Sequence, residues 1–272
     1  MTLAVRLRER FAATEDQSAC ERAVLRHFPQ VATGQHCVDV VELARNAGIH
    51  VTTADTVAFD GALNWDDKGA ATITVAANAN SKRQRFTVAH ELGHWILQRE
   101  LNSEPVGPLF RGVSENQSQV REEERLANLL AAELLMPSVS VRELLKNAGT
   151  DWSFIRQVAA IHNVSQMAAM RRIADLSGTA LVYVSVVPQY FADSESIAEL
   201  DDAIYFKPGT GTYMDRDGTK LVEPPTFESI RRGLKCHLAL RGRFGLIHAV
   251  FDVLVRRMPF VNCGLLASGS PI

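Results

Sequence analysis

Cysteine is scarce in this sequence: Cys20, Cys37, Cys236 and Cys263 are widely separated, and none of them forms a C-x-x-C pair. This spacing excludes a disulfide framework, so the side chains are expected to be free thiols. Long apolar runs are absent as well, because no segment approaches the ~18 uninterrupted apolar residues of a membrane span. We therefore expect a protein that has no membrane partner.

A signal peptide and a strong net charge are also missing. The first ten residues, MTLAVRLRER, lack the apolar core that secretion requires, which predicts a cytoplasmic protein. The formal net charge of -2 gives no overall attraction to nucleic acid, so any DNA contact would need a local basic patch. Apolar residues, in contrast, make up 46% of the 272 positions, which is enough for two or three domains with proper cores.

Residues 87–96, TVAHELGHWI, carry the pattern His-Glu-x-x-His. On a helix, His90 and His94 lie one turn apart, roughly 6 Å along the axis, so both imidazoles can share one metal ion. The Glu91 carboxylate can reach a water on that metal without being a ligand itself. Because the flanking residues are apolar or small, where unpaired polar groups are costly, a metal site is favoured over two surface histidines. Gly93 leaves room for another segment or a substrate to approach.

Hydrophobic periodicity predicts an α+β fold around this run. We expect one or two amphipathic helices in residues 1–30, a helix over 38–44, an extended segment at 49–52, and a hairpin of strands 61–65 and 71–75. Lys82, Arg83 and Arg85 precede the metal helix and are interpreted as a solvated helix start.

A third metal ligand has to come from elsewhere, because catalytic zinc sites use three protein ligands and leave one position for water. A second helix is predicted from near Val120 to Met136, with a buried stripe at Ala127, Leu130, Ala131, Leu134 and Leu135. Glu124 lies three residues before Ala127 and therefore on the inward face.

Other polar residues of this second helix receive secondary roles. Asn128 is expected to hydrogen-bond a ligand or the metal helix. Glu122 and Glu123 are interpreted as solvated acids of the first turn, and Glu133 as a surface residue. If the helix phase is wrong by one residue, Glu123 replaces Glu124 as the ligand.

Three motifs in order carry a family likeness: RFTVAHELGH at residues 85–94, ERLAN at 124–128 and AAELLMP at 131–137. Together they resemble the ImmA/IrrE family of metallopeptidases, over about residues 35–137. The resemblance implies a zincin-like catalytic domain in which His90, His94 and Glu124 are the metal ligands and Glu91 is the catalytic glutamate. The ligand set is gluzincin-like, with Glu in the third position.

The resemblance also implies a function. Family members are metal-dependent endopeptidases that cleave a helix-turn-helix (XRE-type) repressor and so derepress stress or DNA-damage response genes. A metal-bound water would attack the peptide carbonyl, with Glu91 as general base. The ligand types suit Zn2+, and Mn2+ stays open. The substrate-binding candidates are Arg85 and the strand residues Thr72, Ile73 and Thr74, which could pair with an extended substrate by edge addition.

The chain is predicted to have three domains: a zincin-like domain over residues 1–137, with an N-terminal helical segment at 1–30; a helix-turn-helix-like helical module over 138–177; and, by resemblance to IrrE-type members, a GAF-like α+β sensor domain over 178–272. The middle module carries few basic residues, which favours protein docking or a structural role over direct DNA binding.

Within the last domain we expect strands at 180–187 and 201–206, a helix over 226–240 and strands through 250–255. This domain is a candidate receiver of a small-molecule or redox signal. Cys236 and Cys263 are interpreted as buried inert thiols in preference to oxidation sensors.

Two alternatives from other functional classes stay open. One is a DNA-binding transcriptional regulator in which the metal helix is a structural relic. The other is a catalytically silent protein that sequesters the repressor. Cleavage of the repressor by the purified chain, and its dependence on Glu91, would separate both from the peptidase.

Overall fold

The computed structural model describes residues 16–33, 37–55, 60–101, 117–146 and 152–178, and beyond them the backbone of the strands between Leu181 and Ser268. The chain divides into two compact units, Met1–Ser140 with Ile161–Ser165, and Val141–Ala160 with Gln166–Ile272. Within the described ranges, no helix combines the length and apolar character needed to cross a bilayer.

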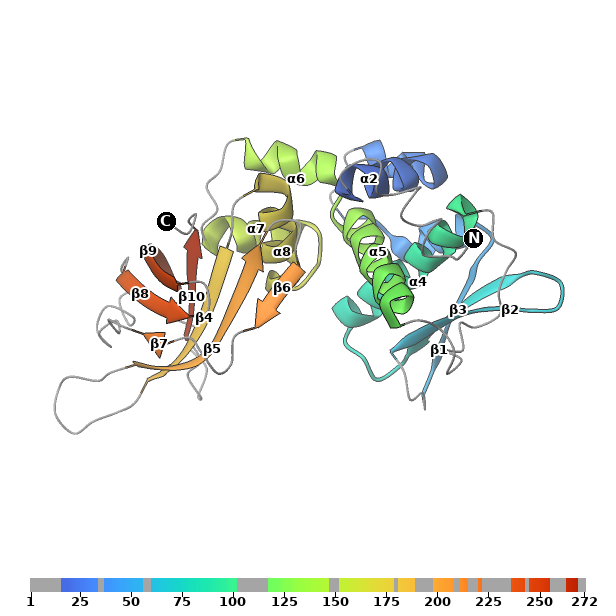
Figure 1. Cartoon of the computed structure of the whole chain (residues 1–272). Coiled ribbons are helices and arrows are strands. Elements are labelled where there is room, and N and C mark those ends of the chain that lie inside the picture. The colour runs from blue at the N-terminus through green and yellow to red at the C-terminus, as the bar shows by residue number, and fades with distance from the viewer. Residues whose placement is uncertain are drawn as a thin grey trace. The chain divides into compact units, whose positions relative to one another are not determined.

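The first unit combines a small sheet with helices (Figure 1). Its elements in order are α2 (Asp16–His27), the 3-10 helix η1 (Pro29–Thr33), α3 (Val40–Asn46), β1 (His50–Ala54), β2 (Gly61–Trp65), β3 (Ala71–Ala76), α4 (Ser81–Glu100) and α5 (Gln117–Leu135). The predicted helices, extended segment and hairpin of residues 38–136 are confirmed within these bounds. For residues 1–30 the structure describes one helix, α2, and residues 1–15 lie outside the described residues.

β3 is the central strand of the first sheet, whose order is β1-β3-β2. It pairs in parallel with β1, where Val51 faces Ile73, and antiparallel with β2, where Leu63 faces Ile73. The prediction that Thr72, Ile73 and Thr74 receive a substrate by edge addition is therefore wrong, because both sides of their strand are already paired.

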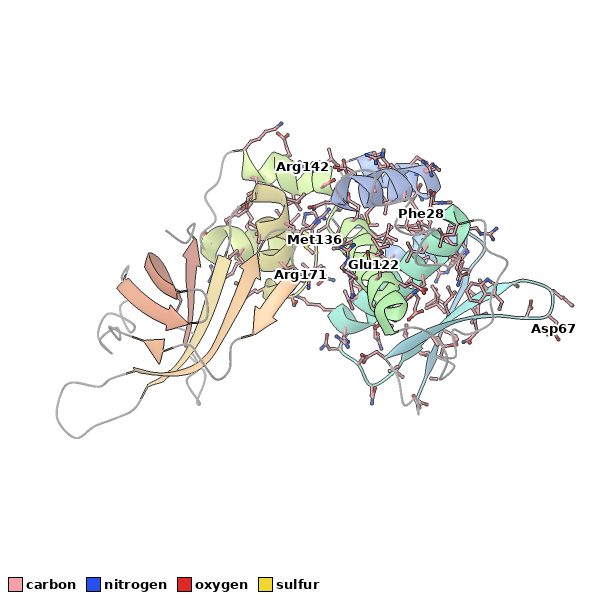
Figure 2. The ribbon with its side chains drawn as sticks, viewed as in Figure 1. Phe28, Asp67, Glu122, Met136, Arg142 and Arg171 are labelled. Carbon is pink, nitrogen blue, oxygen red and sulfur yellow. The ribbon has the colours of Figure 1, made fainter. Side chains whose placement is uncertain are left out.

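The turn between β2 and β3 follows from its sequence. The Asp66 carboxylate accepts hydrogen bonds from the backbone N–H groups of Lys68, at 2.9 Å, and Ala70, at 2.8 Å. Gly69 has a φ of 79°, a left-handed conformation that glycine adopts without the steric cost of a side chain. The turn, marked by Asp67 in Figure 2, joins β2 and β3 in antiparallel register.

α4 is capped by the Asn80 side chain, which accepts a hydrogen bond from the Arg83 N–H at 3.0 Å. The helix therefore begins at Ser81, and the basic residues predicted to precede it lie in its first turns. Lys82 Nζ donates to Val164 O at 2.7 Å. Arg85 donates to Val38 O at 3.1 Å and to His162 O at 3.3 Å. Lys82 and Arg85 thus tie the start of the metal helix to the Ile161–Ser165 turn, and are not simply solvated.

Arg85→Met should destabilise this attachment by about 1–3 kcal/mol, because the change leaves two part-buried carbonyl oxygens without their charged donor. The expected result is faster hydrogen exchange at amides of the Ile161–Ser165 turn, followed by mass spectrometry of peptides covering it. Arg45→Met removes an exposed arginine from α3 of the same unit and is the matched control. Equal exchange in both variants would contradict the role assigned to Arg85.

The far end of α4 packs against α2. The Trp95 ring lies 5.5 Å from the His27 ring and 6.0 Å from that of Phe28, measured between centroids. Glu100, at the last position of α4, forms ion pairs with Arg26 and His27 of α2. Both cysteines of this unit are free thiols, as predicted: Cys20 is buried in α2 and Cys37 is exposed. Cys236 and Cys263 belong to strands whose side chains lie outside the described residues.

α5 ends at Leu135, two residues before Pro137, and α6 (Ser138–Leu145) follows directly. The prediction that Glu133 is a surface residue is wrong, because only 2% of it is exposed. Its carboxylate accepts hydrogen bonds from the backbone N–H of Ser138, at 2.8 Å, and from the Ser138 hydroxyl, at 2.9 Å. Glu133 therefore satisfies a backbone donor at the N-terminus of α6, where helices leave such donors unpaired.

The second unit contains α7 (Trp152–Ile161) in large part and α8 (Gln166–Ser177), followed by a sheet with the order β6-β5-β4-β10-β9-β8-β7. Its strands are β4 (Leu181–Pro188), β5 (Ala198–Lys207), β6 (Gly211–Met214), β7 (Lys220–Leu221), β8 (Cys236–Gly242), β9 (Gly245–Leu254) and β10 (Cys263–Ser268). α8 contacts β4 and β5.

The strands predicted in this unit are confirmed, and the α+β character holds for both units. The helix predicted over 226–240 is wrong at its end, since Cys236–Leu240 lie in β8 and pair antiparallel with β9. Residues 226–235 lie outside the described residues. The three-domain division, the helix-turn-helix-like module and the GAF-like domain stay predictions.

Candidate metal centre

His90, Glu91 and His94 lie in the middle of α4, where the helix is enclosed by its neighbours. α4 contacts β2 and β3 of the sheet, and also α2, α3 and α5. Thr87–Ala89 and Glu91–Leu97 are accordingly buried. The local reason is the spread of apolar and small residues over every face of this stretch, which is typical of a helix buried on all sides.

α5 approaches α4 closely at Gly93. A Cβ built on Gly93 would lie 2.7 Å from Ala127 O and 3.1 Å from Ala127 Cα. The missing side chain therefore does admit another segment, as the sequence suggested, and that segment is the backbone of α5. This approach brings the polar residues of α5 within reach of both histidines.

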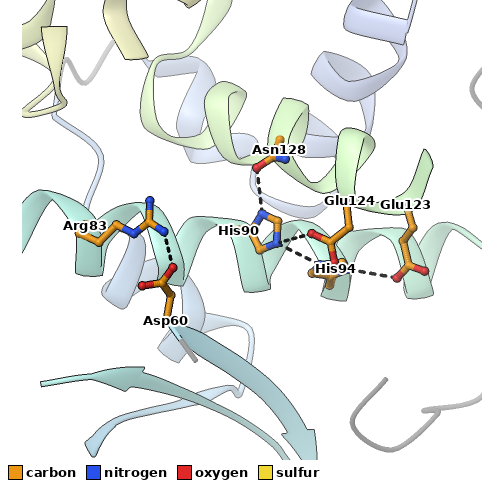
Figure 3. Close-up of polar contacts among 7 residues, drawn as sticks. All are labelled: Asp60, Arg83, His90, His94, Glu123, Glu124 and Asn128. Carbon is orange, nitrogen blue, oxygen red and sulfur yellow. Dashed lines mark hydrogen bonds and ion pairs between the residues drawn. The ribbon is translucent and has the colours of Figure 1, made fainter. Parts of the chain in front are cut away.

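The two histidines and Glu124 converge on one point (Figure 3). His90 Nε2 and His94 Nε2 are 3.2 Å apart, and Glu124 carboxylate oxygens lie 3.4 Å from the first and 3.8 Å from the second. Ligands about 2.0–2.2 Å from a tetrahedral zinc ion are separated from one another by about 3.3–3.6 Å. The donor set and its spacing thus fit a small dication.

Both imidazoles are held from their other ring nitrogen by α5. His90 Nδ1 lies 3.2 Å from Asn128 Oδ1, the kind of contact expected for Asn128. His94 Nδ1 lies 3.0 Å from Glu123 Oε1. With Nδ1–H donating to an oxygen in each case, both Nε2 atoms carry the lone pair that a metal needs.

The prediction that Glu123 is a solvated acid is wrong, because only 8% of it is exposed. A signal was present in the sequence: Leu126, Ala127 and Leu130 follow Glu123 at three, four and seven positions, the spacing of one buried helix face. Glu122, by contrast, forms an ion pair with Arg125 at 2.7 Å.

Glu91 lies beside His90 and His94 and is bound by the sheet. The backbone N–H of Leu63, in β2, donates to its carboxylate. Burial raises the pKa of Glu91 above its usual value and outweighs the opposing charges of His94 and His90. A carboxyl whose pKa is moved towards neutrality is a better general base, and a bound dication would act in the opposite direction.

The pKa of His94 is also perturbed. Burial acts to lower it, but the hydrogen bond that the ring donates to Glu123 and the charges of Glu123, Glu91 and Glu124 outweigh burial and raise the pKa of His94 above its usual value. The cluster of three carboxylates around the histidines therefore creates a site that favours positive charge, which a dication supplies.

Gly61→Ala should separate β2 from α4. A Cβ on Gly61 would lie 2.1 Å from Thr87 Cγ2, 3.2 Å from Thr74 O and 3.6 Å from Glu91 Oε1, so the Thr87 methyl group is the severe overlap. Relieving that overlap costs about 1–3 kcal/mol of stability and weakens the Leu63–Glu91 hydrogen bond. The measurement is urea unfolding of the variant and of Gly61→Ala/Thr87→Ser, which lacks the clashing methyl group and should regain most of the loss. An unrecovered double variant would show that the clash is not the cause.

The other predicted site residues have their polar groups engaged away from the histidines. Thr72, Ile73 and Thr74 use their backbone within the sheet. The Arg85 guanidinium is bound to Val38 O and His162 O.

The part of the chain that contains α4 is similar to a known protein family. Residues 44–174 match the family model Peptidase_M78, described as the IrrE N-terminal-like domain. This range begins in α3 and runs through α8, and it includes every residue of the candidate metal centre.

The chain is also similar to two proteins that are named as metallopeptidases. The chain is 29% identical to the radiation response metalloprotease IrrE of Deinococcus radiodurans, over 43% of this chain and 34% of that protein. It is also 29% identical to the metallopeptidase ImmA of Bacillus subtilis, over 39% of this chain and 59% of that protein. The chain thus matches about a third of the length of the first relative and somewhat more than half of the second.

Among solved structures, a Mycobacterium tuberculosis transcriptional regulator aligns with a TM-score of 0.49 and 14% identity, covering 98% of this chain and 80% of that chain. A likeness of that size does not establish a shared fold. The family match and the two named relatives together support one resemblance: residues 44–174 are similar to the ImmA/IrrE family of metallopeptidases.

Proposed function

We propose that the chain is a metal-dependent endopeptidase whose ligands are His90, His94 and Glu124 and whose general base is Glu91. The observation that carries the proposal is the convergence of both Nε2 atoms, 3.2 Å apart, with the Glu124 carboxylate, beside a buried glutamate. The zincin-like, gluzincin-type description and the choice of zinc over manganese belong to the same proposal, since two imidazoles and one carboxylate suit zinc.

A dication held by these three residues would lower the pKa of a coordinated water to about 7 and polarise a peptide carbonyl. Glu91 takes the proton from the attacking water and passes it to the leaving amine. The Leu63 N–H fixes the carboxylate during both transfers, because it bonds one side of the group to the sheet. Asn128 keeps the His90 imidazole from turning.

An extended substrate would lie along β2. In the described part of the sheet, β2 is the edge strand next to Glu91, whereas β3 is enclosed by β1 and β2. Adding a peptide to β2 would use backbone hydrogen bonds and bring a scissile carbonyl towards the histidines.

The substrate that we propose is a helix-turn-helix repressor of the XRE type, whose cleavage derepresses stress or DNA-damage response genes in the cytoplasm. Support comes from the names of the relatives, one of which is a radiation response metalloprotease. We further propose that the α7–α8 region is a helix-turn-helix-like docking module and that the part beginning at β4 is a GAF-like sensor that receives a small-molecule or redox signal.

The test is incubation of the purified chain, loaded with Zn2+ or Mn2+, with the repressor encoded beside its gene. New repressor fragments that are absent with the Glu91→Gln variant would support the proposal. Intact repressor, or equal cleavage by both proteins, would rule it out. Binding of intact repressor without cleavage would favour a sequestering protein, and binding of promoter DNA undiminished by Glu91→Gln would favour a DNA-binding regulator.

A further inference from the structure

Glu123 is a buried acid of the candidate metal centre. It belongs to none of the three family motifs and takes no part in the proposed proton transfers. It is 8% exposed and lies next to Glu124 in α5, yet the group of potential metal-binding residues is His90, His94 and Glu124. Its carboxylate points at the opposite side of the His94 ring from the ligand atom (Figure 3). Its role is therefore different from that of its neighbour.

We propose that Glu123 is the positioning residue for His94, a role that rests on the proposed metal site. The Glu123 carboxylate and the His94 ring are 3.0 Å apart, and both side chains are 10% exposed. A buried hydrogen bond from Nδ1–H to the carboxylate fixes the orientation of the neutral ring and leaves Nε2 as the one nitrogen available to a metal. Carboxylate partners of ligating histidines also make the imidazole a stronger donor.

The two histidines are held differently. The His90 side chain is 16% exposed, and its Nδ1 lies 3.2 Å from the oxygen of a neutral amide, that of Asn128. His94 is the more buried of the two and receives a charged carboxylate at 3.0 Å. The charged acceptor, Glu123, thus binds the histidine that has less contact with water. We infer that His94 holds the metal more firmly and that His90 dissociates from it more easily.

The spacing of residues on α5 explains how one helix supplies both the candidate ligand Glu124 and the hydrogen-bond partners of the two histidines. Glu123 and Asn128 lie on either side of Glu124 in the sequence, and α5 approaches α4 closely between them, where Ala127 lies against Gly93. Because the two helices are close together there, the Glu123 carboxylate can reach Nδ1 of His94 while the Glu123 side chain stays buried on the α5 face that packs against α4. The register of the two helices and the geometry of the metal centre are therefore set by the same contact.

The test measures metal affinity by chelator competition for Zn2+, on the full chain, in Glu123→Gln, Glu123→Leu and Glu122→Gln. Gln keeps the volume and an acceptor oxygen but not the charge, so we expect a loss of about 10-fold in affinity for Glu123→Gln and about 100-fold for Glu123→Leu. Glu122→Gln removes an equal charge one position away, on a side chain paired with Arg125, and should change affinity less than about 3-fold.

A second readout is the visible absorption of the Co2+-loaded protein, which reports ligand geometry and should change in both Glu123 variants but not in Glu122→Gln. Far-UV circular dichroism of the metal-free proteins identifies any variant that fails to fold, and Glu123→Gln keeps the test decisive if Glu123→Leu does. Wild-type affinity in Glu123→Gln with an unchanged Co2+ spectrum, or an equal loss in Glu122→Gln, would overturn the assignment. Absence of Zn2+ binding by the wild-type chain would instead overturn the proposed function.

Discussion

Glu91→Gln should bind metal as the wild-type chain does and lose at least about 10²-fold in kcat/KM for repressor cleavage, the low end of what a general base contributes. The amide occupies the same volume and can still accept the Leu63 N–H bond, so the packing of α4 on β2 is kept. What it cannot do is take a proton from the attacking water. The measurements are metal content by elemental analysis and initial cleavage rates on the same preparation.

Alanine variants of the three proposed ligands should behave differently from Glu91→Gln, and this difference identifies Glu91 as the base. His90→Ala, His94→Ala and Glu124→Ala should each lose both metal and activity, because each removes one of three atoms that converge on one point. Glu91→Gln with depleted metal would place Glu91 among the ligands, and Glu91→Gln with full activity would remove it from the chemistry. If Glu124→Ala kept its metal and Glu123→Ala lost it, the two acids would have exchanged roles.

Gly93→Ala should reduce metal affinity by about 10²-fold or more, although the substituted methyl group touches no ligand. The new Cβ would lie 2.7 Å from Ala127 O, a backbone atom that cannot turn away as a side chain can. α5 must therefore move outwards, and it carries Glu124, Glu123 and Asn128 with it. Replacing Gly by Ala gains about 1 kcal/mol of helix propensity, whereas overpacking costs about 1–3 kcal/mol, so stability should fall as well or at best stay level.

A companion variant separates this mechanism from a general loss of packing. Ala127→Gly in the Gly93→Ala background should not restore metal binding, because the obstructing atoms belong to the Ala127 backbone. This differs from the Gly61 pair, where the obstructing atom is a methyl group that Thr87→Ser removes. Metal affinity of Gly93→Ala equal to that of the wild-type chain would mean that α5 is not held by this contact.

Local patterns in the sequence were sufficient to place the parts of the centre on α4. His90, Glu91 and His94 belong to one helical turn, and a helix of fixed period brings them together whatever the rest of the fold does. The hairpin before them was equally readable, because Asp66 and Gly69 specify its turn. Both features depend on residues close together in the chain.

Strand order depends on distant residues and could not be read in this way. β1 and β3 are separated by β2 in the chain but lie next to each other in the sheet, paired in parallel. The alternation of side chains along β3 is the same for a central and an edge strand, so the periodicity gave no means of excluding edge addition.

The acids of α5 were misread for a related reason. Glutamate is rarely buried without a partner, so a charged residue near a helix start is ordinarily assigned to solvent. Glu123 and Glu133 are buried because their partners, the His94 ring and the Ser138 N–H, belong to other helices. The apolar spacing after Glu123 indicated an inward position, but the identity of the partner required the packing of α4 against α5.

The approach of α5 to α4 at Gly93 also bears on how long the protein survives in a cell. The polar contacts described between α5 and the two histidines come from Glu123, Glu124 and Asn128, so a bound metal would add its binding energy to the docking of one helix on the other. A ligand present at 100 times its dissociation constant contributes about 2.7 kcal/mol to stability. We therefore expect the metal-free chain to unfold more often, and to be degraded faster by proteases, than the metal-loaded chain.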